Sequence, residues 1–190
     1  MIRRIIGWLE RIFGGFTSQE HKLGIELVPF TMHGCNVRSR ISADQWKKVC
    51  SVVHKKARND HRCQICNRSG KSQGFTWPVE CHEVWDFNEA TGTQKLTGMQ
   101  SICPMCHKVK HLGLATRQGY GEAALVHLAK VNGIDAACAE KLVAHAKTVV
   151  KQRSSQEWKL DLTYLNKNEF GFLMTKFTDD EAHKCKNIEF

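Results

Sequence analysis

The sequence predicts an α+β fold in which a zinc site staples two short strands and a helix together, with further short strands and helices on both sides. Two C-x-x-C pairs stand at residues 63–66 and 103–106, strand-like sequence lies between them, and a helix-starting proline follows the first cysteine of the second pair. Because two such pairs complete one metal site, they define a single unit, which we expect over residues 61–115.

The 190-residue chain has the composition of an ordinary globular protein, with 42% apolar and 25% charged residues. Its net charge is +9 at pH 7, and its pI is about 9.2. Lys and Arg displace the counterions of phosphates, so this charge favours a polyanionic partner such as nucleic acid. Many basic proteins bind no nucleic acid, and the charge alone is therefore weak support.

An amphipathic helix is expected over residues 1–15. Its apolar residues recur at three- and four-residue spacing; they are Ile2, Ile5, Ile6, Leu9, Ile12 and Phe13. Such a helix can dock on the protein or on a partner, or lie on an anionic membrane. Docking is favoured because a helix of about twelve residues buries little area. Residues 1–14 are therefore the candidate contact for a protein partner.

No secretory signal is visible at this start, because Glu10 and Arg11 interrupt the apolar residues. No run approaches the roughly 20 apolar residues that span a bilayer, so we expect no transmembrane segment. The nine cysteines are then expected to be metal ligands and buried thiols in a reducing, cytoplasmic setting, and not a disulfide framework.

Residues 24–60 are expected to form two strands and a helix. The β-prone stretches Ile25 to Phe30 and Val37 to Ile41 are separated by turn residues. Ser42 can cap a helix that runs to about Arg58.

Between the two cysteine pairs we expect strands at about 76–86 and 95–102, joined by a turn over residues 88–92. A helix should then run from about Pro104 to Leu112.

The part from 116 to 165 predicts helices at about 121–131 and 135–152, followed by a strand from Trp158 to Leu165. The charged residues 166–190 are expected to be a poorly ordered tail.

The four cysteines of the two pairs have the spacing of a tetrahedral zinc site with four thiolate ligands; they are Cys63, Cys66, Cys103 and Cys106. A structural Zn²⁺ here would close the loop between the pairs and supply folding energy that so polar a segment lacks. The alternative is two unrelated redox or buried pairs. Binding modules without catalytic activity use the same four thiolates, so the zinc site alone predicts no reaction.

Three histidines accompany the zinc site. His107 and His111 are four residues apart on the expected helix, so their imidazoles lie on one face and can share an ion. His82 lies on the first expected strand, within Glu80-Cys81-His82-Glu83. Alone, each would more often be a packed or surface residue. Together in a zinc-knuckle frame they predict a second, catalytic metal site.

Residues 63–112 resemble the HNH endonuclease family, in the subset whose finger is held by two C-x-x-C pairs. The strings NVRS (36–39), ECHEVW (80–85) and CPMCHKVKHLGLA (103–115) are similar to small bacterial and phage proteins of that family, from about residue 25 to 165. The resemblance implies a ββα-metal (His-Me) finger that cleaves phosphodiester bonds of DNA with one divalent ion. That ion would be Mg²⁺, Mn²⁺, Ni²⁺ or Zn²⁺.

The resemblance also implies residue roles. His82 matches the family's general base, and His107 matches the metal-binding histidine at the start of the finger helix. His111 stands where DNase-type colicins have an additional metal-binding histidine. Lys108 and Lys110 would add positive charge at the substrate phosphates.

Two positions depart from the family pattern. Cys81 stands where many members have a metal-binding Asp or His, and Glu83 is a substitute on the same strand. Successive strand residues point to opposite faces, so Cys81 and His82 converge only if the strand twists or bulges there. The family's middle Asn is replaced by Gly98.

Two functional hypotheses follow. The first is a metal-dependent endonuclease, with Cys81 or Glu83 completing the shell of His107 and His111. The second is a non-catalytic, zinc-stapled subunit that binds nucleic acid or protein within a larger defence or phage complex. Trp77 and Trp85 are expected to pack the finger, and Cys35, Cys50, Cys138 and Cys185 have no partner at metal spacing.

Overall fold

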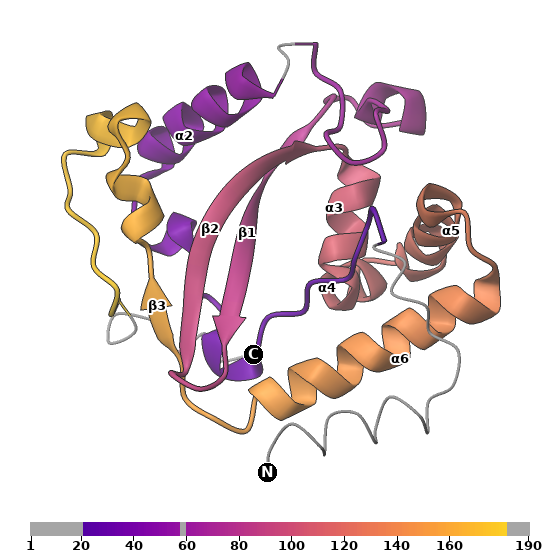
Figure 1. Cartoon of the computed structure of the whole chain (residues 1–190). Helices are drawn as coiled ribbons and strands as arrows, with labels where there is room; N and C mark the ends of the chain where they lie inside the picture. Colours follow the sequence, from indigo (N-terminus) through magenta and orange to yellow (C-terminus); the bar gives the residue numbers. More distant parts are fainter. Residues whose placement is uncertain (1–20, 58–59, 182–190) are drawn as a thin grey trace.

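A long antiparallel hairpin lies at the centre of the molecule (Figure 1). The computed structural model describes residues 21–57 and 60–181, so the helix expected over 1–15 lies outside the described residues. The hairpin consists of β1 (Glu80–Asn88) and β2 (Thr93–Ile102). A third strand, β3 (Lys159–Asp161), pairs parallel to β2, and the sheet order is β1-β2-β3.

The hairpin register places His82 opposite Gln100 and Val84 opposite Gly98. A bulge follows Val84, after which Trp85 pairs with Leu96. The two strands expected from the sequence are therefore present, with boundaries shifted by a few residues.

Within residues 21–57 and 60–181, five α-helices accompany the sheet: α2 (Ala43–Lys56), α3 (Pro104–Lys110), α4 (Leu112–Arg117), α5 (Gly121–Asn132) and α6 (Ala136–Arg153). Ser42 caps α2 through a capping box with Gln45, as its sequence predicts. The helix expected to continue from Pro104 to Leu112 instead breaks at His111, whose backbone (φ −102°, ψ 47°) is not helical.

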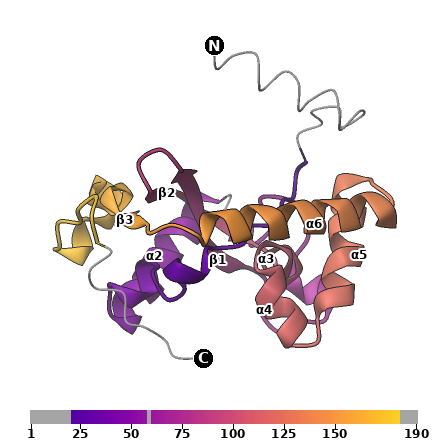
Figure 2. The same cartoon turned by 90° about the horizontal axis from the view of Figure 1, so that it is seen from below.

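Helix α2 lies on one side of the hairpin and α3 to α6 lie on the other (Figures 1 and 2), and an apolar cluster is buried on each side. On one side, Val49 and Val53 of α2 pack with Leu96, Leu160 and other buried residues. On the other side, α3, α4, α5 and α6 enclose a second cluster; its buried members are Leu23, Cys63, Ile102, Cys103, Cys106, Val109, Leu112, Ala124, Leu128 and Ala139.

The expectation of two strands between residues 25 and 41 is wrong. The described chain there is extended without sheet pairing and contains two 3-10 turns, η1 (Phe30–Met32) and η2 (Val37–Ser39). The side chain of Asn36 accepts from Ser39 N at 3.0 Å and forms a capping box, which favours a turn over a strand. The backbone N–H of Glu26 donates to the carbonyl of Lys110 at 3.0 Å, so this segment lies along the end of α3.

The C-terminal expectation is also wrong in part. Only three residues of the expected strand 158–165 form β3, and the chain then turns into η4 (Thr163–Asn166) and η5 (Asn168–Leu173). The expected tail is packed as far as it is described, because its apolar side chains join the cluster beside α2; these are Phe170, Leu173 and Phe177.

In the part of the chain that the structure describes, no helix combines the length and apolarity needed to cross a membrane.

Two candidate metal centres

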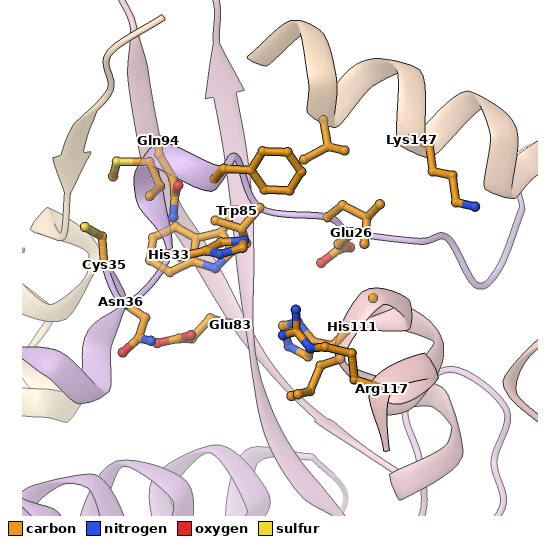
Figure 3. A pocket seen from close by; sticks show the side chains of 18 residues that line it. Glu26, His33, Cys35, Asn36, Glu83, Trp85, Gln94, His111, Arg117 and Lys147 are labelled. Carbon is orange, nitrogen blue, oxygen red and sulfur yellow. The ribbon is translucent and has the colours of Figure 1, made fainter. Parts of the chain in front are cut away.

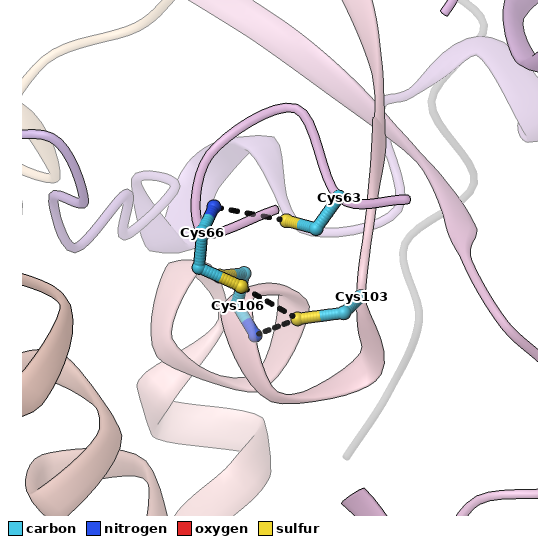
Figure 4. Close-up of side chains that lie close together, drawn as sticks. All are labelled: Cys63, Cys66, Cys103 and Cys106. Atoms are coloured by element: carbon cyan, nitrogen blue, oxygen red, sulfur yellow. Dashed lines mark hydrogen bonds between the residues drawn. The ribbon is translucent and has the colours of Figure 1, made fainter. Parts of the chain in front are cut away.

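The two C-x-x-C pairs meet as their spacing predicts (Figure 4). The four Sγ atoms lie within 4.8 Å of one another, and those of Cys66 and Cys103 are 3.5 Å apart. Tetrahedral zinc at a Zn–S distance of about 2.3 Å places its sulfurs about 3.8 Å apart, so one ion fits this group. The backbone N–H groups of Ile65 and Cys66 point at the Cys63 sulfur, at 3.4 and 3.5 Å. Such contacts stabilise thiolates, and the four cysteines can hold a structural Zn²⁺.

Two side chains from outside the pairs contact the cysteine group. Gln73 Nε2 donates to Cys103 Sγ at 3.2 Å, and His127 Nε2 lies 3.3 Å from Cys106 Sγ. His127 is a buried residue of α5, so this contact joins α5 to the site. No pattern in the sequence indicates this contact, because an isolated histidine on a helix is more often an ordinary packed residue.

The three histidines converge in a second group. One ring nitrogen from each of His82, His107 and His111 lies within 4.8 Å of the other two. Their ring centroids are 4.8 to 5.2 Å apart, and the rings are steeply inclined to one another. His82 comes from β1, while the other two are separated by one turn at the end of α3. These nitrogens are close enough to bind one ion.

Carboxylates orient two of the three imidazoles. Glu26 Oε2 lies 2.8 Å from His82 Nε2, and Glu80 Oε2 lies 2.5 Å from His107 Nδ1. His82 Nδ1 is buried and has no hydrogen-bond partner. A metal-binding histidine characteristically donates its other ring N–H to a carboxylate. Leaving a buried nitrogen without a partner costs free energy, and a metal ion bound to His82 Nδ1 would remove that cost. The three-histidine group therefore fits a cation.

The protonation states also fit a cation. Burial lowers the pKa of His82, and burial together with the neighbouring His107 and His82 lowers the pKa of His111 to about 3. Burial by itself would raise the pKa of Glu26, but the hydrogen bond with His82 and the charge of Lys110 outweigh it and lower the pKa. Neutral imidazoles backed by ionised carboxylates are the form in which histidines bind metals.

The other two residues expected to bind the catalytic ion, Cys81 and Glu83, lie elsewhere. The Cys81 thiol is buried beside the thiol of Cys50, on the α2 side of the sheet. Glu83 Oε1 accepts from the backbone N–H of Val37 at 2.7 Å, and burial raises the pKa of this carboxyl to about 7. The bulge after Val84 lies beyond these residues, so Cys81 and Glu83 keep the face opposite His82.

Lys108 and Lys110 differ in their surroundings. The Lys110 side chain is buried and pairs with Glu26, an arrangement that does not favour the expected contact with substrate phosphates. Lys108 is partly exposed, and its Nζ lies 3.7 Å from the ring centroid of Tyr120.

A cleft of about 470 Å³ opens beside His111 (Figure 3). Glu26 lines it next to the histidine group, and Trp85 forms part of its wall. Arg117 of α4 and Lys147 of α6 also line the cleft and are exposed. The cleft thus brings two cationic side chains to the edge of the three-histidine group.

The sequence led us to expect metal ligands and buried thiols and no disulfide framework, but Cys35 is disulfide-bonded. The free thiols in the described part of the chain are those of Cys50, Cys63, Cys66, Cys81, Cys103, Cys106 and Cys138.

Glu26 and Glu80 are functional candidates that the sequence did not identify. Glu80 stands two residues before His82, and its i,i+2 relation on a strand places both on one face, which was an available signal. Glu26 is 56 residues from its partner and carried no local signal. Comparisons of the chain with family models, with curated proteins and with solved structures found no match.

Proposed function

We propose that this chain is a metal-dependent endonuclease that hydrolyses phosphodiester bonds in DNA. The observation that carries the proposal is the group of three imidazoles, two of them backed by carboxylates, at the edge of a cleft that Arg117 and Lys147 help to line. The net charge of +9 suits a polyanionic substrate.

His82, His107 and His111 would hold a divalent cation, which when bound stabilises developing charge on a phosphate and lowers the pKa of water. Glu26 and Glu80 fix the ring orientation of two ligands, and Lys110 in turn holds Glu26. Zn²⁺ and other late transition metals suit three imidazole ligands better than Mg²⁺ does.

We assign His82 to the metal and not to the general base that the family resemblance implies. Its Nε2 is bonded to Glu26, and its ligand nitrogen falls within the same 4.8 Å group as those of His107 and His111. A general base needs a lone pair directed at a water molecule, whereas this imidazole is only 2% exposed.

Arg117 and Lys147 are the candidate phosphate contacts. Both side chains are exposed where they line the cleft, and they come from different helices. They line the same cleft as His111, so a phosphate bound there would be attracted by their charge as well as by the cation.

The test is cleavage of supercoiled plasmid by the purified protein with magnesium, manganese, nickel or zinc. We expect nicking or linearisation that disappears in His107→Ala and His111→Ala. His145→Ala is the matched control, because this histidine is exposed on α6. If the folded protein cuts nothing with any metal, or if the ligand variants cut as well as the control, the nuclease proposal fails and a non-catalytic binding subunit becomes the better explanation.

The role of His82 is tested separately by counting bound metal. We expect His82→Ala to lose the second ion while keeping the zinc of the four cysteines. A variant that retains both ions but cleaves about 10²- to 10⁴-fold more slowly would instead make His82 a general base.

A further inference from the structure

Three aromatic side chains gather near the start of α3, outside both metal groups. The Phe75 ring centroid lies 5.6 Å from that of Trp77 and 6.4 Å from that of Tyr120. Lys108 Nζ lies 3.7 Å from the Tyr120 centroid and 5.9 Å from that of Phe75. We call these three aromatic residues and Lys108 the aromatic platform.

The platform faces solvent. Trp77 is 46% exposed and Tyr120 is 40% exposed, although Trp77 was expected to pack the finger. Rings that remain this exposed contribute little hydrophobic stabilisation to the fold, so packing alone does not explain why large aromatic residues stand at these positions.

The platform is also held in place. Trp77 Nε1 donates to Glu80 Oε1 at 2.8 Å, and the backbone N–H of Tyr120 donates to the carbonyl of Ala115 at 2.8 Å. The Trp77 ring and the backbone that carries Tyr120 are therefore held before any ligand arrives, which lowers the entropic cost of binding.

A short chain of contacts joins the platform to the candidate catalytic centre. The carboxylate that accepts from Trp77 through Oε1 contacts His107 Nδ1 through Oε2. His111, one helical turn further on, borders the cleft with Arg117. Direct contacts thus link the candidate centre to the platform, and its His111 borders the cleft that Arg117 and Lys147 help to line, so a strand that contacts both would pass close to the histidines.

We propose that the platform binds unpaired nucleobases of a single-stranded nucleic acid segment, with Lys108 at its phosphates. Every base has a π-face, so exposed aromatic side chains bind single strands with little sequence preference. In a duplex these faces are stacked on neighbouring bases and are not accessible. The exposed Lys71, in the 3-10 helix η3 (Gly70–Gln73) just before Phe75, adds charge of the same sign.

This inference rests on the proposed function for its substrate class and refines it to strands with unpaired bases. Binding can nevertheless be measured without cleavage, so the two proposals fail independently. The measurement is fluorescence anisotropy of labelled oligothymidylate and of a duplex of equal length, at one fixed salt concentration and with no divalent metal added.

We expect tighter binding of the single strand, and a loss of about 5- to 150-fold for Trp77→Ala and for Tyr120→Ala. Trp77→Phe should retain most of the affinity, because it keeps an aromatic face. Met174→Ala is the control: Met174 is 95% exposed and caps η5, which packs with α2 on the other side of the sheet. Circular dichroism and zinc content verify that each variant is folded.

Equal affinity for both oligonucleotides overturns the proposal. So does unchanged single-strand affinity in folded Trp77→Ala and Tyr120→Ala. A protein that cleaves plasmid but fails these tests retains its nuclease activity without the platform. If the protein passes these tests but cleaves no DNA, the proposal for the platform stands and the nuclease proposal fails.

Discussion

Glu26 and His82 are in direct contact, with Oε2 of the carboxylate 2.8 Å from Nε2 of the imidazole. The other carboxylate oxygen of Glu26 pairs with Lys110, and its backbone N–H donates to the Lys110 carbonyl. One residue of the extended N-terminal segment therefore orients a metal-ligand candidate on β1 and fixes the end of α3.

Replacing Glu26 should weaken the second metal site without removing a ligand. We expect Glu26→Ala to lower the affinity of the three-histidine centre about 10- to 100-fold, as loss of an outer carboxylate does in other metal sites. Glu26→Gln should lose less, because its amide oxygen can still accept from His82. Competition with a metal-binding dye measures the affinity.

The control for Glu26 is Lys110→Met, which removes the ion pair but leaves the contact with His82. Equal affinity in Glu26→Ala and the wild-type protein would show that the carboxylate does not support a metal ligand.

The four-cysteine site should be needed for folding. Cys66→Ser is expected to lose one zinc per chain and to unfold at a lower temperature, because the site closes the loop between the two cysteine pairs. Cys138→Ser is the control, since Cys138 lies on α6 outside both metal groups. Metal content and thermal unfolding are the measurements, and a fully zinc-loaded Cys66→Ser of unchanged stability would contradict the prediction.

Local patterns predicted the parts of the site that depend on spacing. Two C-x-x-C turns and the i,i+4 pair His107 and His111 each bring their potential ligand atoms together through the geometry of a turn or a helix. Strand alternation also explained correctly why Cys81 does not accompany His82 without a bulge between them.

What the sequence could not predict depends on contacts between distant residues. The β-prone residues from Ile25 to Phe30 pair with no strand. Their segment is held instead by contacts with distant residues, such as Glu26 with His82 of β1 and with Lys110 of α3. Phe170 and Phe177 follow a charged stretch, and only the presence of the α2 cluster shows that they are buried.

Gly70 is required for the approach of the first cysteine loop to α3. A Cβ on this residue would lie 2.3 Å from the Trp77 carbonyl oxygen and 2.7 Å from Pro104 Cδ. We expect Gly70→Ala to destabilise the fold by about 1–3 kcal/mol, the cost of overpacking a close contact. At Gly171 a Cβ meets nothing within 4 Å, so Gly171→Ala is the control. Equal denaturation midpoints for the two variants would show that the loop yields easily.

His54 should make stability depend on pH near neutrality. Burial lowers the pKa of His54, helped by the charge of His61, and its Nδ1 lies 2.8 Å from Ser101 Oγ. At His54 the unfolded chain therefore binds a proton near pH 6.5 more readily than the folded chain does. The folded state is favoured most above that pH, where His54 is neutral in both states, and it loses free energy of unfolding as the pH falls below it. We expect the advantage of the wild-type protein over His54→Gln to shrink between about pH 7.5 and 5.5, by an amount on the order of 1 kcal/mol or less. Denaturant unfolding of both proteins at the same pH cancels the contribution of the metal sites.

Ser101→Ala is the control. It should keep the wild-type dependence of stability on pH, because burial is the main cause of the lowered His54 pKa. If the stability of His54→Gln depends on pH as that of the wild type does, the titrating group lies elsewhere.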